Sequence, residues 1–349
     1  MARRSDRQIF EELLARFESR LRDVFLDCVA DIRDTITLRI VVERLEKGDV
    51  NGAIEAMHLD PDAFARLETA FAEAYNSGGQ ATVGNFPRVI DPDGSRVVFR
   101  WGLRNPVAEQ WLREHSSRLI TRIVEDQRDG IRFILSEGLA RGRNPKRTAL
   151  DVVGRVSRVS NRREGGIIGL TTAQQRYVAR AREELSNPAR MADYLRRQRR
   201  DRRFDRTVAK ALRDGKPLPG DVVDRIVGRY SDRLLQLRGE AIGLSETMTA
   251  LAKSRDDAIR QQIAAGKIDA AAVTKVWKHT PQEHPRHHHR AMNGKSVGID
   301  DQFELPNGVR MSYPHSDDAP ADETVFCKCY HTMKIDFFAA VERRFRAGR

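Results

Sequence analysis

The stretch IFEELLARFESRLRDVFLDCVADIRDTI, which runs from Ile9 to Ile36, decides the fold class of this chain. Its apolar residues recur at intervals of three and four, with charged residues between them. This spacing predicts a helix with one buried face. The apolar stripe consists of Ile9, Phe10, Leu13, Leu14, Phe17, Leu21, Val24, Phe25, Cys28, Val29, Ile32 and Ile36. Because Cys28 lies on this stripe, we expect it to be a small buried apolar residue.

Similar periodicity continues through most of the chain, and capping signals mark where successive helices begin. A capping residue before a proline favours the first helical turn, and this signal occurs at Asp60-Pro61, Asn105-Pro106 and Asn144-Pro145. Further caps are expected at Thr171 or Thr172, Asp221 and Ser245, and helix ends at Gly48, Gly78-Gly79 and Gly266. Residues 76–95 are expected to form a loop and residues 96–103 a strand.

Helical periodicity ends near Val273, and short β-like pieces follow. Turn signals such as Asn293-Gly294 and Asn307-Gly308 separate them. The pieces are VTKVW, KSVGI, VRMSY and ETVF, at residues 273–277, 295–299, 309–313 and 323–326. The sequence therefore predicts a mainly α fold, with an elongated helical body and a small C-terminal α+β domain.

At 349 residues the chain has room for two or three domains. We expect a helical region at 1–95, a basic helical body at 96–270, the α+β domain at 271–335 and a basic tail at 336–349. A hydrophobic content of 40% and a charged content of 32% are typical of a soluble globular protein. No apolar run approaches the roughly 18 residues of a membrane helix, and no secretory signal is recognised. Three cysteines favour a reducing compartment.

The net charge of +12 is unevenly distributed along the chain. Residues 1–75 carry a balance of −5, so the remainder carries +17. Much of the excess lies between Arg141 and Arg206, which favours an anionic partner such as double-stranded DNA, bound through phosphates without sequence preference. The candidate DNA contacts are Arg196, Arg197, Arg199, Arg200, Arg202 and Arg203. The alternative is a solvated face whose arginines pair with Glu183, Glu184, Asp201 and Asp205.

Histidine and cysteine gather near the C-terminus, in EHPRHHHRAMNG (283–294) and FCKCYH (326–331). Zinc prefers tetrahedral sets of four imidazole and thiolate ligands. A set could be drawn from a histidine of the first stretch, both cysteines of the second and a further histidine. The candidate zinc ligands are His289, Cys327, Cys329 and His331, with His315 as another choice for the fourth position. A cluster without metal is the alternative.

An enzyme that uses the same residues is a further interpretation. Cys327 or Cys329 could pair with His289 as a nucleophile, or a bound metal could support a nuclease on the basic chain. Either chemistry needs a carboxylate, for which the candidates are Glu323, Asp317 and Asp318. The sequence contains no P-loop, dinucleotide-binding or Gly-x-Ser-x-Gly motif, and no residue is assigned a catalytic role.

The order of residues in the C-terminal region resembles a known family. The matching positions are Trp277, Arg286, His289, Asn293, Gly294, Phe303, Tyr313, Pro314, Glu323, Cys327 and Cys329. They resemble the C-terminal domain of phage head morphogenesis proteins of the Mu F-like minor capsid family, and the resemblance extends upstream over most of residues 50–335. The chain departs from the family pattern at Gln282, His315, Ser316, Phe326 and Lys328.

This resemblance implies a minor capsid protein of a tailed phage or prophage. Such a protein is attached near the portal inside the head and acts in head assembly and in DNA packaging or ejection. Its implied partners are the portal, the capsid and double-stranded DNA, and it is in the host cytoplasm during assembly. Zinc at the histidine and cysteine cluster would serve as a local staple of a small domain. The alternatives are a metal-dependent nuclease or toxin-like transferase, and a host nucleic-acid-binding adaptor.

Overall fold

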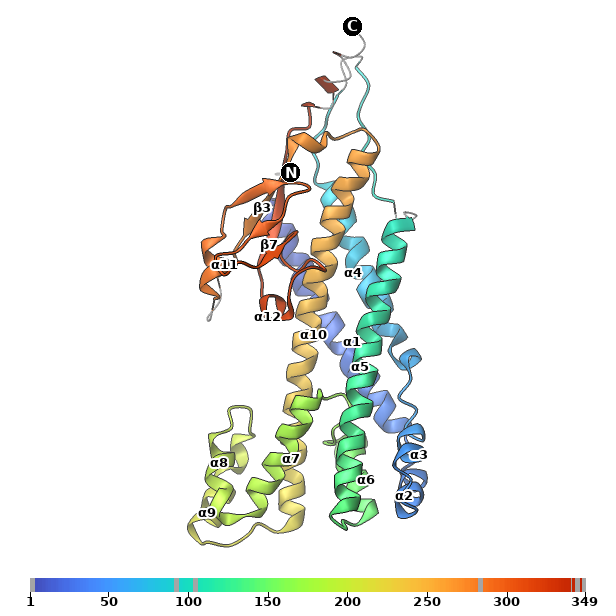
Figure 1. The fold of residues 1–349 in the computed structure, drawn as a ribbon, viewed down its shortest axis with the longest axis vertical. Helices are drawn as coiled ribbons and strands as arrows, with labels where there is room; N and C mark the ends of the chain where they lie inside the picture. The colour runs from blue at the N-terminus through green and yellow to red at the C-terminus, as the bar shows by residue number, and fades with distance from the viewer. Residues whose placement is uncertain are drawn as a thin grey trace. The chain divides into compact units, whose positions relative to one another are not determined.

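The computed structural model of the chain describes residues 4–90, 94–102, 106–281, 285–339, 341, 342 and 346. Helices dominate, and short antiparallel strands are concentrated near the C-terminus (Figure 1). The prediction of a mainly α fold with a small C-terminal α+β region is therefore confirmed.

Four long helices carry most of the fold: α1 (Asp6–Thr35), α4 (Ala65–Gly84), α5 (Pro106–Ala140) and α10 (Gly220–Ala264). The shorter helices before α10 are α2 (Leu38–Glu46), α3 (Val50–Glu55), α6 (Pro145–Val153), α7 (Thr172–Ser186), α8 (Met191–Arg196) and α9 (Asp205–Arg213). After α10 come α11 (His287–Ala291) and α12 (Ala321–Thr324). Single 3-10 turns are η1 (Pro61–Phe64), η2 (Pro188–Arg190), η3 (Arg202–Phe204) and η4 (Ala270–Ala272).

The strands form three small antiparallel sheets. β3 (Val273–Lys278) lies between β4 (Ser296–Gly298) and β7 (Tyr330–Ile335), and Trp277 faces His331 in the register of β3 with β7. The other pairs are β5 (Phe303–Glu304) with β6 (Arg310–Met311), and β1 (Arg155–Val156) with β2 (Arg163–Glu164). The three-stranded sheet is the framework of the C-terminal region.

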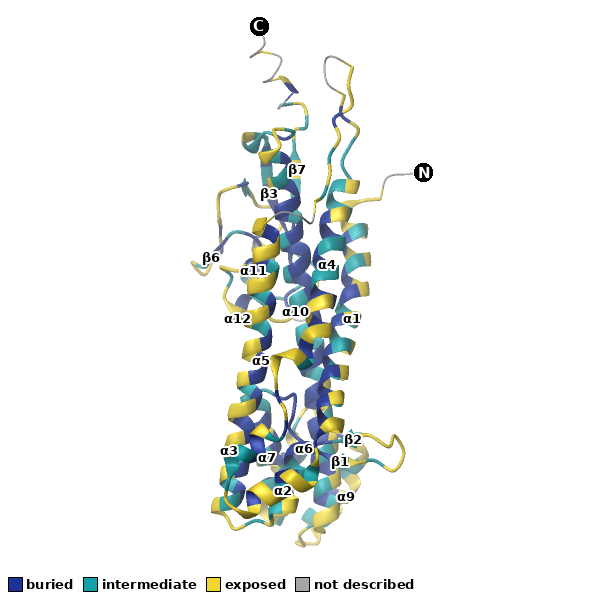
Figure 2. Cartoon of the chain, turned by 90° about the vertical axis from the view of Figure 1, so that its right-hand side faces the viewer, coloured by how far each residue is buried: buried dark blue, intermediate teal, exposed yellow. Residues whose placement is uncertain are grey.

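The helix predicted over Ile9–Ile36 is present as α1, and most of the expected stripe is buried, whereas Ile9, Leu13 and Val24 are partly exposed. Phe17, Leu21, Phe25 and Cys28 are at most 1% exposed. Figure 2 shows that the helices have buried and exposed faces, as expected for amphipathic helices. The helix ends before Ile36, which is itself buried.

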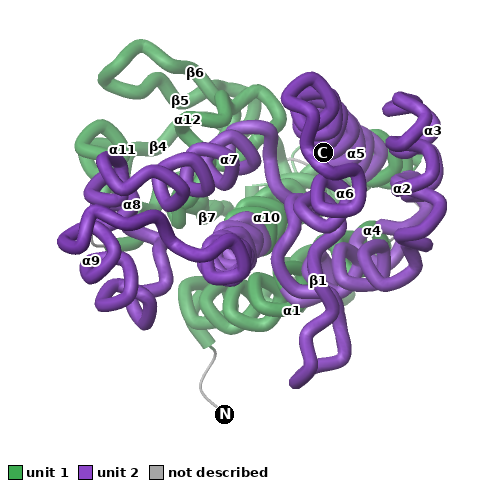
Figure 3. Tube along the Cα trace, turned by 90° about the horizontal axis from the view of Figure 1, so that it is seen from below, with its two compact units in different colours: residues 1–22, 68–114, 241–349 green, residues 23–67, 115–240 purple. Residues whose placement is uncertain are grey.

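The chain divides into two compact units (Figure 3). Unit 1 contains residues 1–22, 68–114 and 241–349, and unit 2 contains residues 23–67 and 115–240. The division falls within α1, α4, α5 and α10, so each unit is assembled from segments that are far apart in the sequence. The C-terminal strands and helices after α10 belong to unit 1.

In unit 1, the C-terminal sheet packs against α10 and against the first helix of the chain, α1. Ile259 of α10 shares an apolar cluster with Val273 of β3. The rings of Phe10 and Tyr330 stack at 4.2 Å, and the Arg255 guanidinium lies over both. These contacts tie β3 to α10, and β7, which follows the two cysteines, to α1 and α10.

In unit 2, a glycine-rich loop at 165–170 is buried, and side chains satisfy its backbone. The Gly165 N–H donates to Asp232, and the Arg33 guanidinium donates to the Ile168 carbonyl at 2.6 Å. Arg238 donates to the Gly169 carbonyl at 2.9 Å. A buried loop without such partners would leave unpaired backbone groups, so these polar residues are part of the core.

Three sequence predictions about helices and strands are wrong for identifiable reasons. Helix α4 continues through Gly78 and Gly79, because these glycines allow close packing: an added Cβ would lie 2.2 Å from Ser254 Oγ and 2.2 Å from the Trp101 ring. Ser245 does not begin a helix but lies within the continuous α10. Residues 96–102 form only an isolated bridge, between Ile90 and Arg96.

Other differences are local. ETVF at 323–326 does not form a strand, because residues 321–324 form α12. Pro106 begins α5 as expected, whereas its predicted cap Asn105 and strand residue Leu103 lie outside the described residues, as do Gln282 and His284. The tail at 336–349 is described only at residues 336–339, 341, 342 and 346.

Candidate metal centre

His289, Cys327 and Cys329 lie together in the C-terminal region, and we name them the His/Cys group. His289 is in α11, which follows the loop after β3, and both cysteines directly precede β7. The three residues are at most 2% exposed. Trp277 and Phe303 pack in the same apolar cluster as both thiols. The group is therefore held by an aromatic core.

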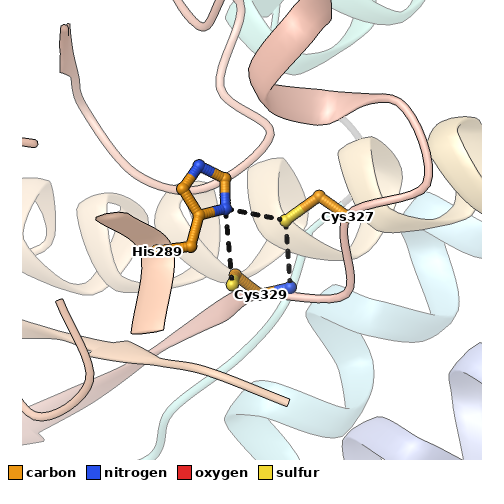
Figure 4. A group of neighbouring side chains, drawn as sticks. All are labelled: His289, Cys327 and Cys329. Carbon is orange, nitrogen blue, oxygen red and sulfur yellow. Dashed lines mark hydrogen bonds between the residues drawn. The ribbon is translucent and has the colours of Figure 1, made fainter. Parts of the chain in front are cut away.

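The distances within the His/Cys group match those of a metal site. His289 Nδ1 lies 3.3 Å from Cys327 Sγ and 3.7 Å from Cys329 Sγ (Figure 4). Zinc bonds of about 2.3 Å to sulfur and about 2.0–2.1 Å to nitrogen place tetrahedral ligand atoms about 3.6 Å apart. The three ligand atoms lie within 4.8 Å of one another, so the group could hold a metal ion.

The two thiols also act on each other's pKa. The hydrogen bond from the Cys329 thiol lowers the pKa of Cys327, and the same contact raises the pKa of Cys329. The Cys329 backbone N–H donates to Cys327 Sγ at 3.3 Å. The lowered pKa of Cys327 favours its thiolate form, which is the form that metals bind.

Glu323 orients His289 from the other side of the imidazole ring. Its Oε2 lies 2.8 Å from Nε2 of His289 and 2.8 Å from Nε2 of His288, and Asn307 Nδ2 donates to its Oε1 at 2.7 Å. Burial raises the pKa of Glu323, but the hydrogen bonds with His288 and Asn307 outweigh burial and hold that pKa below its ordinary value. Metal-bound histidines are commonly held in this way by a carboxylate.

The other residues of the predicted C-terminal motif have structural contacts. Arg286 donates to the Val325 carbonyl at 2.9 Å, and the Asn293 side chain accepts from the backbone of His279. The Gly294 N–H donates to the Trp277 carbonyl, and its φ of +84° is one that glycine adopts readily. Tyr313 and Pro314 are buried in the turn that follows β6.

His331 lies outside the His/Cys group. Its ring stacks on Tyr313 with centroids 4.7 Å apart, and burial lowers the pKa of His331 well below its ordinary value. Two of the candidate carboxylates are also engaged elsewhere. Asp317 accepts a hydrogen bond from Trp111, and Asp318 accepts from Ser312 within its own turn.

The arginines proposed to contact DNA divide into two sets in unit 2. Arg197 is only 16% exposed and makes a two-pronged ion pair with Glu184, at 2.7 and 2.8 Å. Arg200 is similarly enclosed and pairs with Asp205. These two arginines stabilise the fold, as the alternative interpretation of the sequence expected.

The exposed set includes basic residues that the sequence analysis did not name. Arg196 pairs with Asp193, and Arg203 pairs with Asp201. Arg199 and Arg202, which precede α9, are exposed, and so are three basic residues at helical spacing along α9. We name these five residues together the α9 basic surface: Arg199, Arg202, Arg206, Lys210 and Arg213. In the part of the chain that the structure describes, none of the five forms an ion pair. The three residues of α9 could have been predicted, because Lys210 follows Arg206 by four residues and Arg213 follows Lys210 by three, which places them on one face of a helix.

Family models, curated proteins and solved structures were compared with the chain, and none matches it. Among the helices of the described residues, none is both long and apolar enough to cross a membrane. The His/Cys group and the α9 basic surface are the features that bear on function.

Proposed function

We propose that this chain is a minor capsid protein of a tailed phage or prophage. It is attached near the portal on the inside of the head, and it acts in head assembly and in DNA packaging or ejection. Its partners are the portal protein, the capsid and double-stranded DNA, which it contacts without sequence preference. Before assembly it is in the host cytoplasm.

The observation that carries the proposal is the order of the motif residues together with their grouping in space. Trp277, Phe303, Cys327 and Cys329 share one buried cluster, although about fifty residues separate the first from the last. His289 packs edge-on against Trp277, with ring centroids 5.5 Å apart. Residues that resemble a head morphogenesis motif thus form the core of one module, which favours a folding and docking unit.

The metal of this module is proposed to be zinc. Two thiols and an imidazole form a soft ligand set that suits zinc better than magnesium or calcium, which prefer oxygen ligands. The module is small, and a metal bond between α11 and the segment before β7 would link its two halves. Zinc acts here as a staple that stabilises the fold.

The α9 basic surface is proposed to contact DNA phosphates. Each neutralised phosphate steepens the salt dependence of binding by about 0.9 in a plot of log affinity against log salt concentration. Arg206→Gln/Lys210→Gln should therefore flatten that slope by about two. The control Arg7→Gln/Arg39→Gln removes the same charge from exposed arginines elsewhere and should leave the slope unchanged. If the salt dependence of DNA binding had the same slope in Arg206→Gln/Lys210→Gln as in the control variant, this surface would be ruled out as the DNA contact.

The location of the protein is tested with purified heads of the phage or induced prophage that encodes it. Quantitative mass spectrometry of these heads should find the chain in few copies, together with the portal protein. Heads that lack the chain, from a host in which it is expressed, would overturn the proposal.

The alternative of a metal-dependent nuclease or transferase is disfavoured by the burial of its reactive groups. Cys327 and Cys329 are each 1% exposed, and His289 is 2% exposed. A substrate phosphate would have to displace the aromatic core to reach them. Plasmid incubated with the pure protein and divalent metals should stay intact. Cutting that is lost in His289→Ala would favour the enzyme instead.

A further inference from the structure

A groove between α5 and α7 is a separate feature of unit 2. Its volume of about 330 Å³ lies at the lower end of the range of about 300–1,000 Å³ that is typical of ligand pockets. It is lined by Phe133 and Glu137 from α5 and by Arg176, Ala179, Arg180 and Glu183 from α7. None of these residues belongs to the α9 basic surface, so the groove is not part of the proposed contact with double-stranded DNA.

Close packing of α5 on α7 sets the position of the groove. At Gly130 the two helices approach so closely that an added Cβ would lie only 1.9 Å from Gln175 Oε1. Phe133 follows Gly130 by three residues, and Arg176 directly follows Gln175. The close approach at Gly130 therefore brings the ring of Phe133 and the guanidinium of Arg176 to the same groove, although 43 residues separate them in the sequence.

Two arginines give the groove a basic wall. Arg176 and Arg180 are exposed and lie four residues apart, on one face of α7. Within the described residues, neither of them forms an ion pair. The two carboxylates of the groove are occupied, because Arg141 lies 2.7 Å from Glu137 and 3.4 Å from Glu183. The groove therefore offers two free guanidinium groups to an anionic partner.

Exposed aromatic rings lie beside these arginines. Phe133 lines the groove and is 48% exposed, and Tyr177, which is 46% exposed, directly follows Arg176. A single exposed aromatic residue is ordinary on a protein surface. Aromatic rings next to unpaired arginines, however, form the combination that binds single-stranded nucleic acid, since bases stack on the rings while the arginines contact the phosphates.

A duplex could not use the ring of Phe133, because its bases already stack on one another and do not reach the surface of a protein. An unpaired strand presents the face of each base. We propose that the groove binds single-stranded DNA, with one base stacked on Phe133 and the adjacent phosphates on Arg176 and Arg180. The choice of DNA over RNA rests on the proposed function, whereas the binding of a single strand rests on the groove alone.

Fluorescence anisotropy with the full-length protein tests the stacking contact. The probes are a short fluorescein-labelled oligothymidylate and an abasic oligomer of equal length, which has the same phosphates but no bases. Phe133→Ala should weaken binding of oligothymidylate by about 5–150-fold and leave binding of the abasic oligomer unchanged. The control Phe338→Ala removes a ring that is 56% exposed in unit 1, and it should bind both probes as the wild type does.

The salt dependence of binding tests the phosphate contacts. Each neutralised phosphate of a single strand contributes about 0.7 to the slope of log affinity against log salt concentration, so Arg176→Gln/Arg180→Gln should flatten the slope for oligothymidylate by about 1.4. The control Arg7→Gln/Arg39→Gln should leave it unchanged. Binding of duplex DNA should not respond to Phe133→Ala, so a failure of this groove is distinguishable from a failure of the α9 basic surface.

Three outcomes would overturn the proposal. If oligothymidylate bound no more tightly than the abasic oligomer, or equally tightly to Phe133→Ala and the wild type, no base would stack in the groove. Tighter binding of oligouridylate than of oligothymidylate would make RNA the partner. An acidic peptide with one tryptophan that bound more tightly than oligothymidylate, and lost affinity in both groove variants, would assign the groove to a protein partner.

Discussion

Replacing Arg197 with alanine should destabilise unit 2 much more than replacing its neighbour Arg199. The Arg197 guanidinium makes two hydrogen bonds to Glu184 and a third to the Tyr230 hydroxyl at 3.1 Å. The Glu184 side chain is only 7% exposed. Arg197→Ala therefore leaves a carboxylate buried without its cation, which costs about 3–5 kcal/mol.

The expected change in melting temperature follows from the size of unit 2. In a unit of this size, 1 kcal/mol corresponds to about 2–4 °C. At the lower limit of the cost, about 3 kcal/mol, Arg197→Ala should melt about 6–12 °C lower than the wild type. Arg199→Ala removes an exposed side chain and should change stability by less than about 0.5 kcal/mol. Circular dichroism during heating measures both shifts.

A double variant separates the loss of the Arg197 contacts from the cost of leaving the Glu184 carboxylate buried without a cation. Because Arg197→Ala/Glu184→Ala removes the stranded carboxylate as well, it should recover part of the lost stability. The reasoning is refuted if Arg197→Ala melts within about 2 °C of Arg199→Ala, since Arg197 would then be a solvated residue.

Three further predictions concern other parts of the fold. Gly165→Ala should lower the free energy of unfolding by more than about 2 kcal/mol, because φ is +73° and the new Cβ would lie 2.9 Å from Gly228 Cα. Gly215 has a φ of +61° in open space, so Gly215→Ala should lower it by only about 1–2 kcal/mol. Urea unfolding measures both changes. Burial raises the pKa of Asp224, but its hydrogen bond with Arg182 helps outweigh burial and holds that pKa below its ordinary value. The ionised Asp224 stabilises the fold above about pH 4, and this contribution is lost as the pH falls further. Between about pH 4 and lower pH, the free energy of unfolding from urea titrations should therefore fall less in Asp224→Asn than in the wild type. Removing the proposed zinc with a chelator should lower the melting temperature of the C-terminal region, and added zinc should restore it.

Each of these has an outcome that would contradict it. Equal costs for the two glycine variants would show that the buried loop adjusts to an added methyl group. If the free energy of unfolding of Asp224→Asn fell at acid pH as much as that of the wild type, the carboxylate would be equally stabilised in the folded and the unfolded chain. A melting temperature that does not change with chelator would contradict the proposal that zinc stabilises the C-terminal module.

The helical part of the fold could be predicted because periodicity reports burial directly. Most of the stripe from Phe10 to Ile32 in α1 is buried as its spacing indicates. Gly78 and Gly79 could not be interpreted correctly, since a glycine that ends a helix and one that admits a close neighbour look alike in sequence. The neighbours, Ser254 and Trp101, come from distant segments.

The candidate site was only partly predictable for a similar reason. Cys327, Cys329 and His289 are distinctive because the chain contains few cysteines and histidines. Glu323 was named as a motif position and as a candidate catalytic carboxylate, whereas its hydrogen bond to His289 from a different helix could not be predicted. The pairing of Arg197 with Glu184 rather than with solvent also depends on tertiary packing, which local spacing does not encode.

The stacking of Phe10 on Tyr330 has a consequence for synthesis on the ribosome. The two rings are about 320 residues apart, and at about 5–20 residues per second the second emerges roughly 16–64 s after the first. During that interval the apolar face of the first helix has no partner from the end of the chain. Products that stop before Tyr330 therefore lack the ring that stacks on Phe10, and they are expected to be less stable than the complete chain.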